Sequence, residues 1–186
     1  MIKYRYRSIW VADVPLDTFD TRLDPLLELL RSSRSDRLYV IGDLIDAGRL
    51  RHKWFWSERP DTLIQKFLCR QRKHAVVTYV TGTHDVFCRS PIDCKAGQVR
   101  VTREAVHHAA DGRSYLVVNG PEDNAALRSA ELKGVDGVIC GDWVRGCLAL
   151  VEDQTGKFSL IHSSDVAAAA RSRAPIRQAE VQSVTA

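Results

Sequence analysis

The sequence lacks any apolar stretch long enough to cross a membrane. Its apolar runs are far shorter than the roughly 20 residues that a membrane-spanning helix needs. No apolar signal region follows the basic residues at positions 1–7. We therefore expect a cytoplasmic protein, with a peripheral contact at the inner membrane face as the alternative.

The motifs of several enzyme classes are also missing. The chain contains neither the Gly-x-x-x-x-Gly-Lys-Ser/Thr loop of P-loop proteins nor the Gly-x-Ser-x-Gly elbow of serine hydrolases. Its five cysteines form no Cys-x-x-Cys pair, and their odd number leaves one unmatched in any disulfide scheme. We expect reduced structural thiols.

The chain is long enough and apolar enough to bury a core. It has 186 residues, of which 45% are hydrophobic, and this argues against a disordered protein. The formal net charge is only +4. We expect no nucleic-acid partner.

Basic residues gather in two places. Arg49, Arg51 and Lys53 precede an aromatic triplet at residues 54–56, and a second cluster at residues 70–74 follows a helical stretch. Such clusters suit a phosphorylated ligand or an anionic membrane surface; a solvated helix face, or a loop packed on a sheet, is the alternative. We take Arg49, Arg51 and Lys53 as candidate ligand-binding residues.

The hydrophobic pattern predicts an α/β fold. In the first half, buried-strand patterns alternate with helical spacings, which favours βαβ units and a parallel sheet. In the second half, hairpin signals at Asp111-Gly112 and Thr155-Gly156 favour a second, mixed or antiparallel sheet. The predicted strands are residues 8–13, 37–41, 75–80, 105–109, 114–118, 137–140, 147–152 and 158–162, and the predicted helices are residues 23–30, 63–68 and 124–133.

The last segment of the chain shows no persistent apolar period. From Ser163 onward, an alanine run is followed by scattered arginine, serine and glutamine. We therefore divide the chain into a folded domain at residues 1–162 and a disordered C-terminal tail at residues 163–186.

Each strand of the first half ends at a polar cluster. Asp13 follows the first strand, Asp43 the second, and the run Thr83-His84-Asp85 the third. The carboxyl ends of parallel strands meet at one edge of a sheet, where ligands bind. Carboxylates and imidazoles gathered there would repel or stay unpaired unless divalent metal ions neutralised them. Taken singly, each residue has a simpler explanation as a helix cap, a turn residue or a hydrogen-bonded loop histidine.

Five blocks of the chain form a recognisable series. They are I-W-V-A-D-V-P, L-Y-V-I-G-D-L-I-D, V-T-Y-V-T-G-T-H-D, D-G-R-S-Y-L-V-V-N-G and G-V-D-G-V-I-C-G-D-W, in this order between residues 4 and 161. The series resembles the calcineurin-like metallophosphoesterases, and within them the UDP-2,3-diacylglucosamine pyrophosphatase-like branch. The resemblance implies a two-sheet α/β sandwich that is flanked by helices and truncated in its second half. It also implies a site with two metal ions, often manganese, at which phosphoester or pyrophosphate bonds are hydrolysed.

The resemblance also implies metal ligands at the strand ends. Asp13 stands where the family has its first carboxylate ligand, and Asp43 stands where the family has the carboxylate that bridges the two metals. Thr83 replaces an asparagine ligand, and Asn119 stands where a histidine ligand is expected. The motifs therefore occur in the family's order, but some of their metal-ligand positions carry a different residue.

Catalytic residues are matched, but further ligands are lost. His84 and Asp85 match the family's histidine that protonates the leaving group and the acid that orients it. Pro15 replaces a histidine ligand, and a proline side chain has no donor for a metal. Gly141 runs directly into Asp142, so the Gly-His-x-His block of the family is missing with both histidines. We expect hydrolytic activity to be weak or lost.

The surviving ligands suit a hard cation better than two transition metals. Two carboxylates with a carboxamide and a hydroxyl can hold one Mg²⁺ or Mn²⁺ ion, and lost ligands weaken metal binding strongly. We expect one divalent ion rather than two, with no ion as the alternative.

Two functions therefore compete. The first is a metal-dependent hydrolase that acts on a phosphorylated small molecule or a nucleotide-sugar lipid. The second is a non-catalytic phosphoesterase remnant that binds a phosphorylated or anionic ligand. Loss of strand material after Gly141 would also expose a sheet edge, which favours a homo-oligomer.

Overall fold

A computed structural model describes most of the regular structure of the chain. The described residues are 2–12, 23–42, 62, 65–67, 69–70, 74–82, 85, 94–96, 99–119, 132–140, 147–172 and 175–180. Within these ranges, no helix combines the length and the apolar character that crossing a bilayer requires.

Among the described residues, the larger sheet, sheet A, has eight strands. They are β1 Tyr4–Ala12, β2 Ser33–Ile41, β3 Val76–Val80, β4 Cys94–Ala96, β5 Val99–Thr102, β9 Cys147–Glu152, β10 Phe158–His162 and β11 Ala179–Glu180. Their order is β11-β10-β9-β1-β2-β3-β5-β4. The strands β1, β2, β3 and β5 are parallel, and the others pair antiparallel at either side. The parallel sheet that we predicted for the first half is therefore present.

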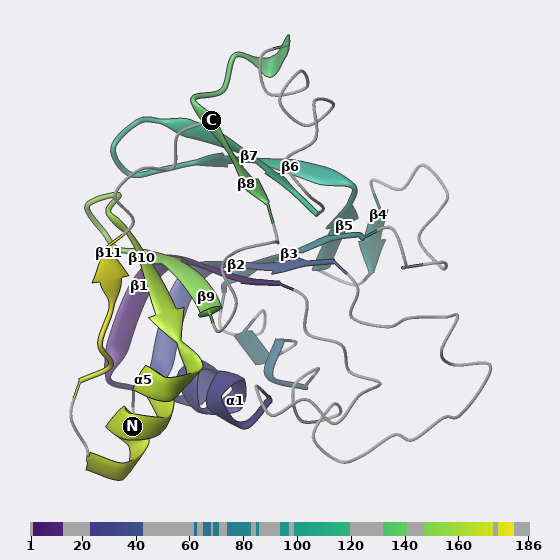
Figure 1. Ribbon diagram of the computed structural model, residues 1–186. Helices are drawn as coiled ribbons and strands as arrows, with labels where there is room; N and C mark the ends of the chain where they lie inside the picture. Colours follow the sequence, from purple (N-terminus) through teal and green to yellow (C-terminus); the bar gives the residue numbers. More distant parts are fainter. Residues whose placement is uncertain are drawn as a thin grey trace.

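The smaller sheet, sheet B, covers one face of sheet A (Figure 1). Its strands are β6 Glu104–His108, β7 Ser114–Val118 and β8 Gly137–Cys140. The predicted hairpin forms between β6 and β7, and β8 adds parallel to β7, so sheet B is mixed as expected. Trp10 and Tyr39 of sheet A pack with Tyr115, Val117 and Ile139 of sheet B in the core between the sheets.

Helices cover the opposite face of sheet A. The helix predicted at residues 23–30 is α1 (Leu23–Ser32), and its leucines are buried against the sheet. Asp24 in its first turn and Arg31 in its last turn complement the helix dipole. Residues 62, 65–67 and 69–70 are helical too, in agreement with the helix predicted there. The predicted fold class, a two-sheet α/β sandwich flanked by helices, is confirmed.

The hairpin of β9 and β10 belongs to sheet A, so our assignment of it to the second sheet is wrong. Strand β9 pairs antiparallel with β1 at the centre of sheet A. Ala149, Leu150 and Val151 are all buried. Since neighbouring residues of a strand point to opposite faces, such a strand must be covered on both sides. Sheet A offers that position, between the helices and sheet B.

The segment after β10 also folds onto sheet A. It forms the helix α5 (Ser163–Ser172) and then β11, which pairs antiparallel with β10. The prediction of a disordered tail at residues 163–186 is therefore wrong for the residues described there.

Three apolar side chains explain why the segment is ordered. Val166 and Ala169 of α5 and Ile176 beyond it are buried in the core that α1 forms with sheet A. The Ile176 amide also donates a hydrogen bond of 2.7 Å to the Tyr4 hydroxyl. Alanine has the highest helix propensity, so the run favours a helix once a few side chains can anchor it. Of the described residues of α5, only Val166 and Ala169 lie in this core, and two apolar positions are too few for a helical period to be recognised in the sequence.

The strands β4 and β5 were absent from our prediction. Strand β5 pairs parallel with β3 and carries the alternation Val-Arg-Val-Thr, in which Arg100 is exposed and Val101 is buried. A run of only four residues gives little periodic signal.

We expect Val166→Ala to lower the free energy of unfolding by about 1.5–3 kcal/mol, because this side chain is 1% exposed and loses buried apolar surface. The matched control is Val76→Ala, whose side chain is 57% exposed; its cost should stay under about 1 kcal/mol. Urea denaturation of both variants measures the difference. Equal costs would mean that α5 does not pack on the core.

Candidate functional site

The carboxyl ends of β1, β2 and β3 lie level with one another. Ala12 pairs with Ile41, and Ile41 pairs with Val80, across the parallel strands. The Gly42 amide donates a hydrogen bond of 2.7 Å to the Val80 carbonyl, so the pairing continues past β2. We call this edge, marked by Ala12, Ile41 and Val80, the carboxyl edge. The three strand ends that the polar clusters follow in the sequence therefore meet at one edge of the sheet, as predicted.

Asn119 brings sheet B to the carboxyl edge. It follows β7, and its side-chain amide lies so close to Gly42 that a Cβ atom added to Gly42 would overlap it. Gly42 also has a φ of 65°, in the left-handed region that favours glycine. Both its conformation and its neighbour therefore require a glycine. The predicted ligand Asn119 thus contacts the residue that immediately precedes the predicted ligand Asp43.

Asp85 closes the turn after β3. Its side chain is buried, and its Oδ2 atom accepts a hydrogen bond of 2.6 Å from the Gly82 amide. The bond spans Thr83 and His84 in the sequence, so it fixes the backbone on both sides of them. This is compatible with the orienting role that we predicted for Asp85.

The other predicted site residues lie outside the described part of the chain. They are Asp13, Asp43, Thr83, His84, Arg49, Arg51 and Lys53. Within the described part, no three His, Cys, Asp or Glu side chains are grouped as a metal ion would require. The side-chain oxygen of Asn119 is a neutral group of the kind that hard cations such as Mg²⁺ accept beside carboxylates.

A second polar cluster, which our sequence reasoning missed, lies between the two sheets. At its centre is the fully buried Glu152 at the end of β9. Its Oε2 atom lies 2.8 Å from Ser8 Oγ and 3.0 Å from His107 Nε2. Its Oε1 atom accepts a bond of 2.8 Å from the Ala110 amide and lies 3.2 Å from Arg7 Nε in an ion pair. We call these five residues the interlayer cluster.

Tyr39 sets the orientation of the His107 ring. The Tyr39 hydroxyl lies 3.1 Å from His107 Nδ1, and burial raises the pKa of Tyr39 to about 12. The hydroxyl therefore stays protonated at neutral pH and can donate to Nδ1, which leaves Nε2–H to donate to Glu152. The neighbouring His108 is exposed, as the alternation of a strand predicts.

The interlayer cluster has a structural role rather than a catalytic one. Ser8, His107 and Glu152 are completely buried. In a catalytic triad the serine bonds to the histidine, whereas here Ser8 donates to Glu152. The cluster joins β1 and β9 of sheet A to β6 of sheet B. Its signal in the sequence is weak, because its members meet only after the sheets have packed.

The charge of Glu152 is stabilised in the fold. Burial alone would raise the pKa of its carboxyl, but the hydrogen bonds from His107, Ser8 and the Ala110 amide outweigh burial and lower that pKa below its ordinary value. In the unfolded chain these donors are lost. The unfolded carboxyl therefore binds a proton more readily than the folded one.

No protein-family model matches the chain, and no curated protein matches it. The resemblance to the metallophosphoesterases therefore rests on the sequence blocks alone.

We expect Glu152→Gln to cost about 3–5 kcal/mol of stability, because a carboxamide places an N–H group against donors and leaves Arg7 without its buried partner. The control Glu104→Gln breaks a partly exposed pair with Lys133 and should cost no more than about 1 kcal/mol. Denaturation of the two variants at neutral pH makes the comparison.

The same pair of proteins tests the pH dependence. The contribution of Glu152 is complete above the ordinary carboxyl pKa and is lost as the pH falls through the lower folded pKa, so wild-type stability decreases on acidification. The slope should be shallower in Glu152→Gln, although Asp111 and Asp153, whose pKa values are also lowered, still contribute. An unchanged slope would contradict the assignment.

Proposed function

We propose that the chain is a phosphoesterase domain of the calcineurin-like type, with a site at the carboxyl edge whose hydrolytic activity is weak or lost. The observation that carries the proposal is the contact between Asn119 and Gly42. It links the end of β7 to the end of β2, the two places where the resemblance expects ligands of one site. A chance likeness of sequence blocks gives no reason for this contact.

The chain's own residues suggest how such a site would work. Asp13, Asp43, Thr83 and Asn119 would hold a divalent ion, Mn²⁺ or Mg²⁺. When bound, the ion would acidify a water molecule and neutralise charge on a phosphoryl group.

Proton transfer would fall to a separate pair. His84 would donate a proton to the leaving oxygen. Asp85 would orient the imidazole, and the bond from the Gly82 amide holds the Asp85 carboxylate in place. The substrate class is a phosphorylated small molecule or a nucleotide-sugar lipid.

The low activity follows from the ligand set. Pro15 and the missing Gly-His-x-His block remove imidazole ligands, and Thr83 offers a neutral hydroxyl in place of a carboxamide. With one ion rather than two, part of the charge that develops on the phosphoryl group stays uncompensated. The alternative function, a non-catalytic remnant that binds an anionic ligand, has the same fold and no turnover.

We expect metal-stripped protein to bind one Mn²⁺ ion in calorimetric titration, and Asp43→Asn to weaken that binding by about 10-fold or more, because a carboxylate ligand is lost. The matched control is Asp24→Asn, in the first turn of α1, which should leave the titration unchanged. Binding that does not depend on Asp43 would contradict the proposed site.

Turnover separates the two functions. The same three proteins are assayed with a chromogenic phosphodiester and with pyrophosphate, each with Mn²⁺ and with chelator. Slow hydrolysis that requires both the metal and Asp43 supports a weak hydrolase. Metal binding without turnover supports the non-catalytic remnant.

A further inference from the structure

A pocket of about 700 Å³ opens at the other end of the parallel strands. It is lined by Arg5 near the start of β1, by the first residues of β2, by the last turn of α1 and by the described residues 66, 69, 70, 74 and 75. It therefore lies at the amino ends of the strands, opposite the carboxyl edge. We call it the amino-edge pocket.

The described lining of the amino-edge pocket is strongly cationic. It carries Arg5, Arg31, Arg34, Lys66, Arg70 and His74. Asp36 is its one carboxylate among the described residues, and it lies 4.0 Å from Arg5 between exposed side chains. An exposed pair of this kind contributes little. The five Lys and Arg side chains against one Asp give a net charge of +4, equal to the formal net charge of the whole chain.

Arg70 is the central cation of the pocket, and it is buried with a side chain only 7% exposed. Its Nη2 atom donates to the Leu30 carbonyl at 2.8 Å and to Ser33, and its Nη1 atom donates to Ser35 Oγ at 3.2 Å. All these acceptors are neutral. A buried charge with neutral partners is costly unless an anion completes its environment.

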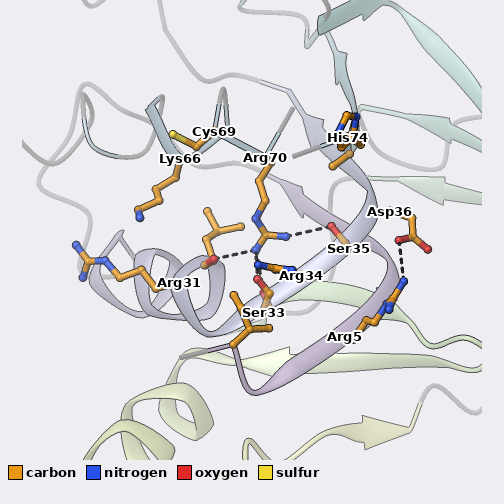
Figure 2. A pocket seen from close by; sticks show the side chains of 13 residues that line it. Arg5, Arg31, Ser33, Arg34, Ser35, Asp36, Lys66, Cys69, Arg70 and His74 are labelled. Atoms are coloured by element: carbon orange, nitrogen blue, oxygen red, sulfur yellow. Dashed lines mark hydrogen bonds and ion pairs between the residues drawn. The ribbon is translucent and has the colours of Figure 1, made fainter. Parts of the chain in front are cut away.

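The neighbours of Arg70 add to the excess of charge. Arg34 pairs with Arg5 in the register of β1 and β2, and like charges placed opposite each other repel. Burial first, and then the charge of Arg34, lower the pKa of Arg70 to about 10. The guanidinium is therefore still charged at neutral pH. In Figure 2, Arg31 and Lys66 lie on one side of Arg70, and the pair of Arg5 and Asp36 lies on the other.

A purely structural role explains only part of this arrangement. Arg70 joins the last turn of α1 to the start of β2, and a cation is favourable at the carboxyl end of a helix. That role accounts for Arg70. The helix dipole also accounts for Arg31 in the last turn of α1. Neither role gives a reason for Arg34 and Lys66 to line the same cavity.

We propose that the amino-edge pocket binds a phosphorylated ligand that carries at least two negative charges. Arginine and lysine are the usual phosphate-binding residues. A volume of about 700 Å³ lies in the range of small-molecule sites. The phosphate can belong to a free metabolite or to a lipid headgroup. The proposal concerns a different site from the carboxyl edge and does not depend on hydrolysis.

Inorganic pyrophosphate is the first probe, titrated by calorimetry into the full chain at fixed salt. A chelator is present throughout, so that metal binding and hydrolysis at the carboxyl edge play no part. We expect Arg34→Gln and Lys66→Gln each to weaken binding about tenfold, because each removes a charge-assisted contact. The matched control is Arg113→Gln at the hairpin of sheet B, which should change affinity less than about twofold. Circular dichroism and thermal melting confirm that the variants fold.

The outcomes decide the proposal and the source of the phosphate. No binding of pyrophosphate, or an equal loss in Arg113→Gln, would overturn it and leave Arg70 with its structural role alone. If pyrophosphate binds as expected, phosphatidic acid vesicles are added in a sedimentation assay. Vesicle binding that needs Arg34 and Lys66 supports a lipid headgroup, and its absence supports a soluble phosphate compound.

Discussion

A carboxylate shielded from water joins the two sheets of this protein. Glu152 is paired with Ser8 in the register of β9 and β1, and it reaches His107 on sheet B. A charge in that position must be matched inside the protein, because both faces of the central strands are covered. The surrounding donors match it. They fix the hairpin of β6 and β7 over sheet A, and Asn119, at the end of β7, takes its place beside Gly42 as a consequence.

The two edges of the parallel sheet carry opposite chemistry. At the carboxyl edge, the sequence places aspartates after β1, β2 and β3, and the structure adds the neutral amide of Asn119. At the amino edge, the pocket around Arg70 gathers guanidinium and ammonium groups. Under the two proposals, the first edge would bind a cation and the second an anion, and the parallel strands separate the two sites.

Elements set by local pattern could be predicted from the sequence, whereas contacts between distant segments could not. The leucine spacing gave α1, and the Asp111-Gly112 turn gave the hairpin of sheet B. Which sheet β9 joins depends on whether both of its faces are covered in the fold, and the order of α5 depends on a few side chains that anchor it in the core. Neither is visible in a local pattern, so both were misassigned. At the carboxyl edge, Asn119 was predicted as a ligand through the resemblance alone, and no local pattern indicates that it lies beside Gly42. The bond between His107 and Glu152 joins residues 45 positions apart, which no local period records.

The separation of the two edges limits what the amino-edge pocket can do. Strand β2 runs from Ser33 in that pocket to Ile41 at the carboxyl edge. At about 3.3 Å per residue, this separation is roughly 25 Å. A phosphate held beside Arg70 therefore cannot at the same time occupy the proposed site beside Asn119. In the proposed pocket, a bound phosphate would instead neutralise Arg70 and its neighbours, at the junction between α1 and β2 that Arg70 joins.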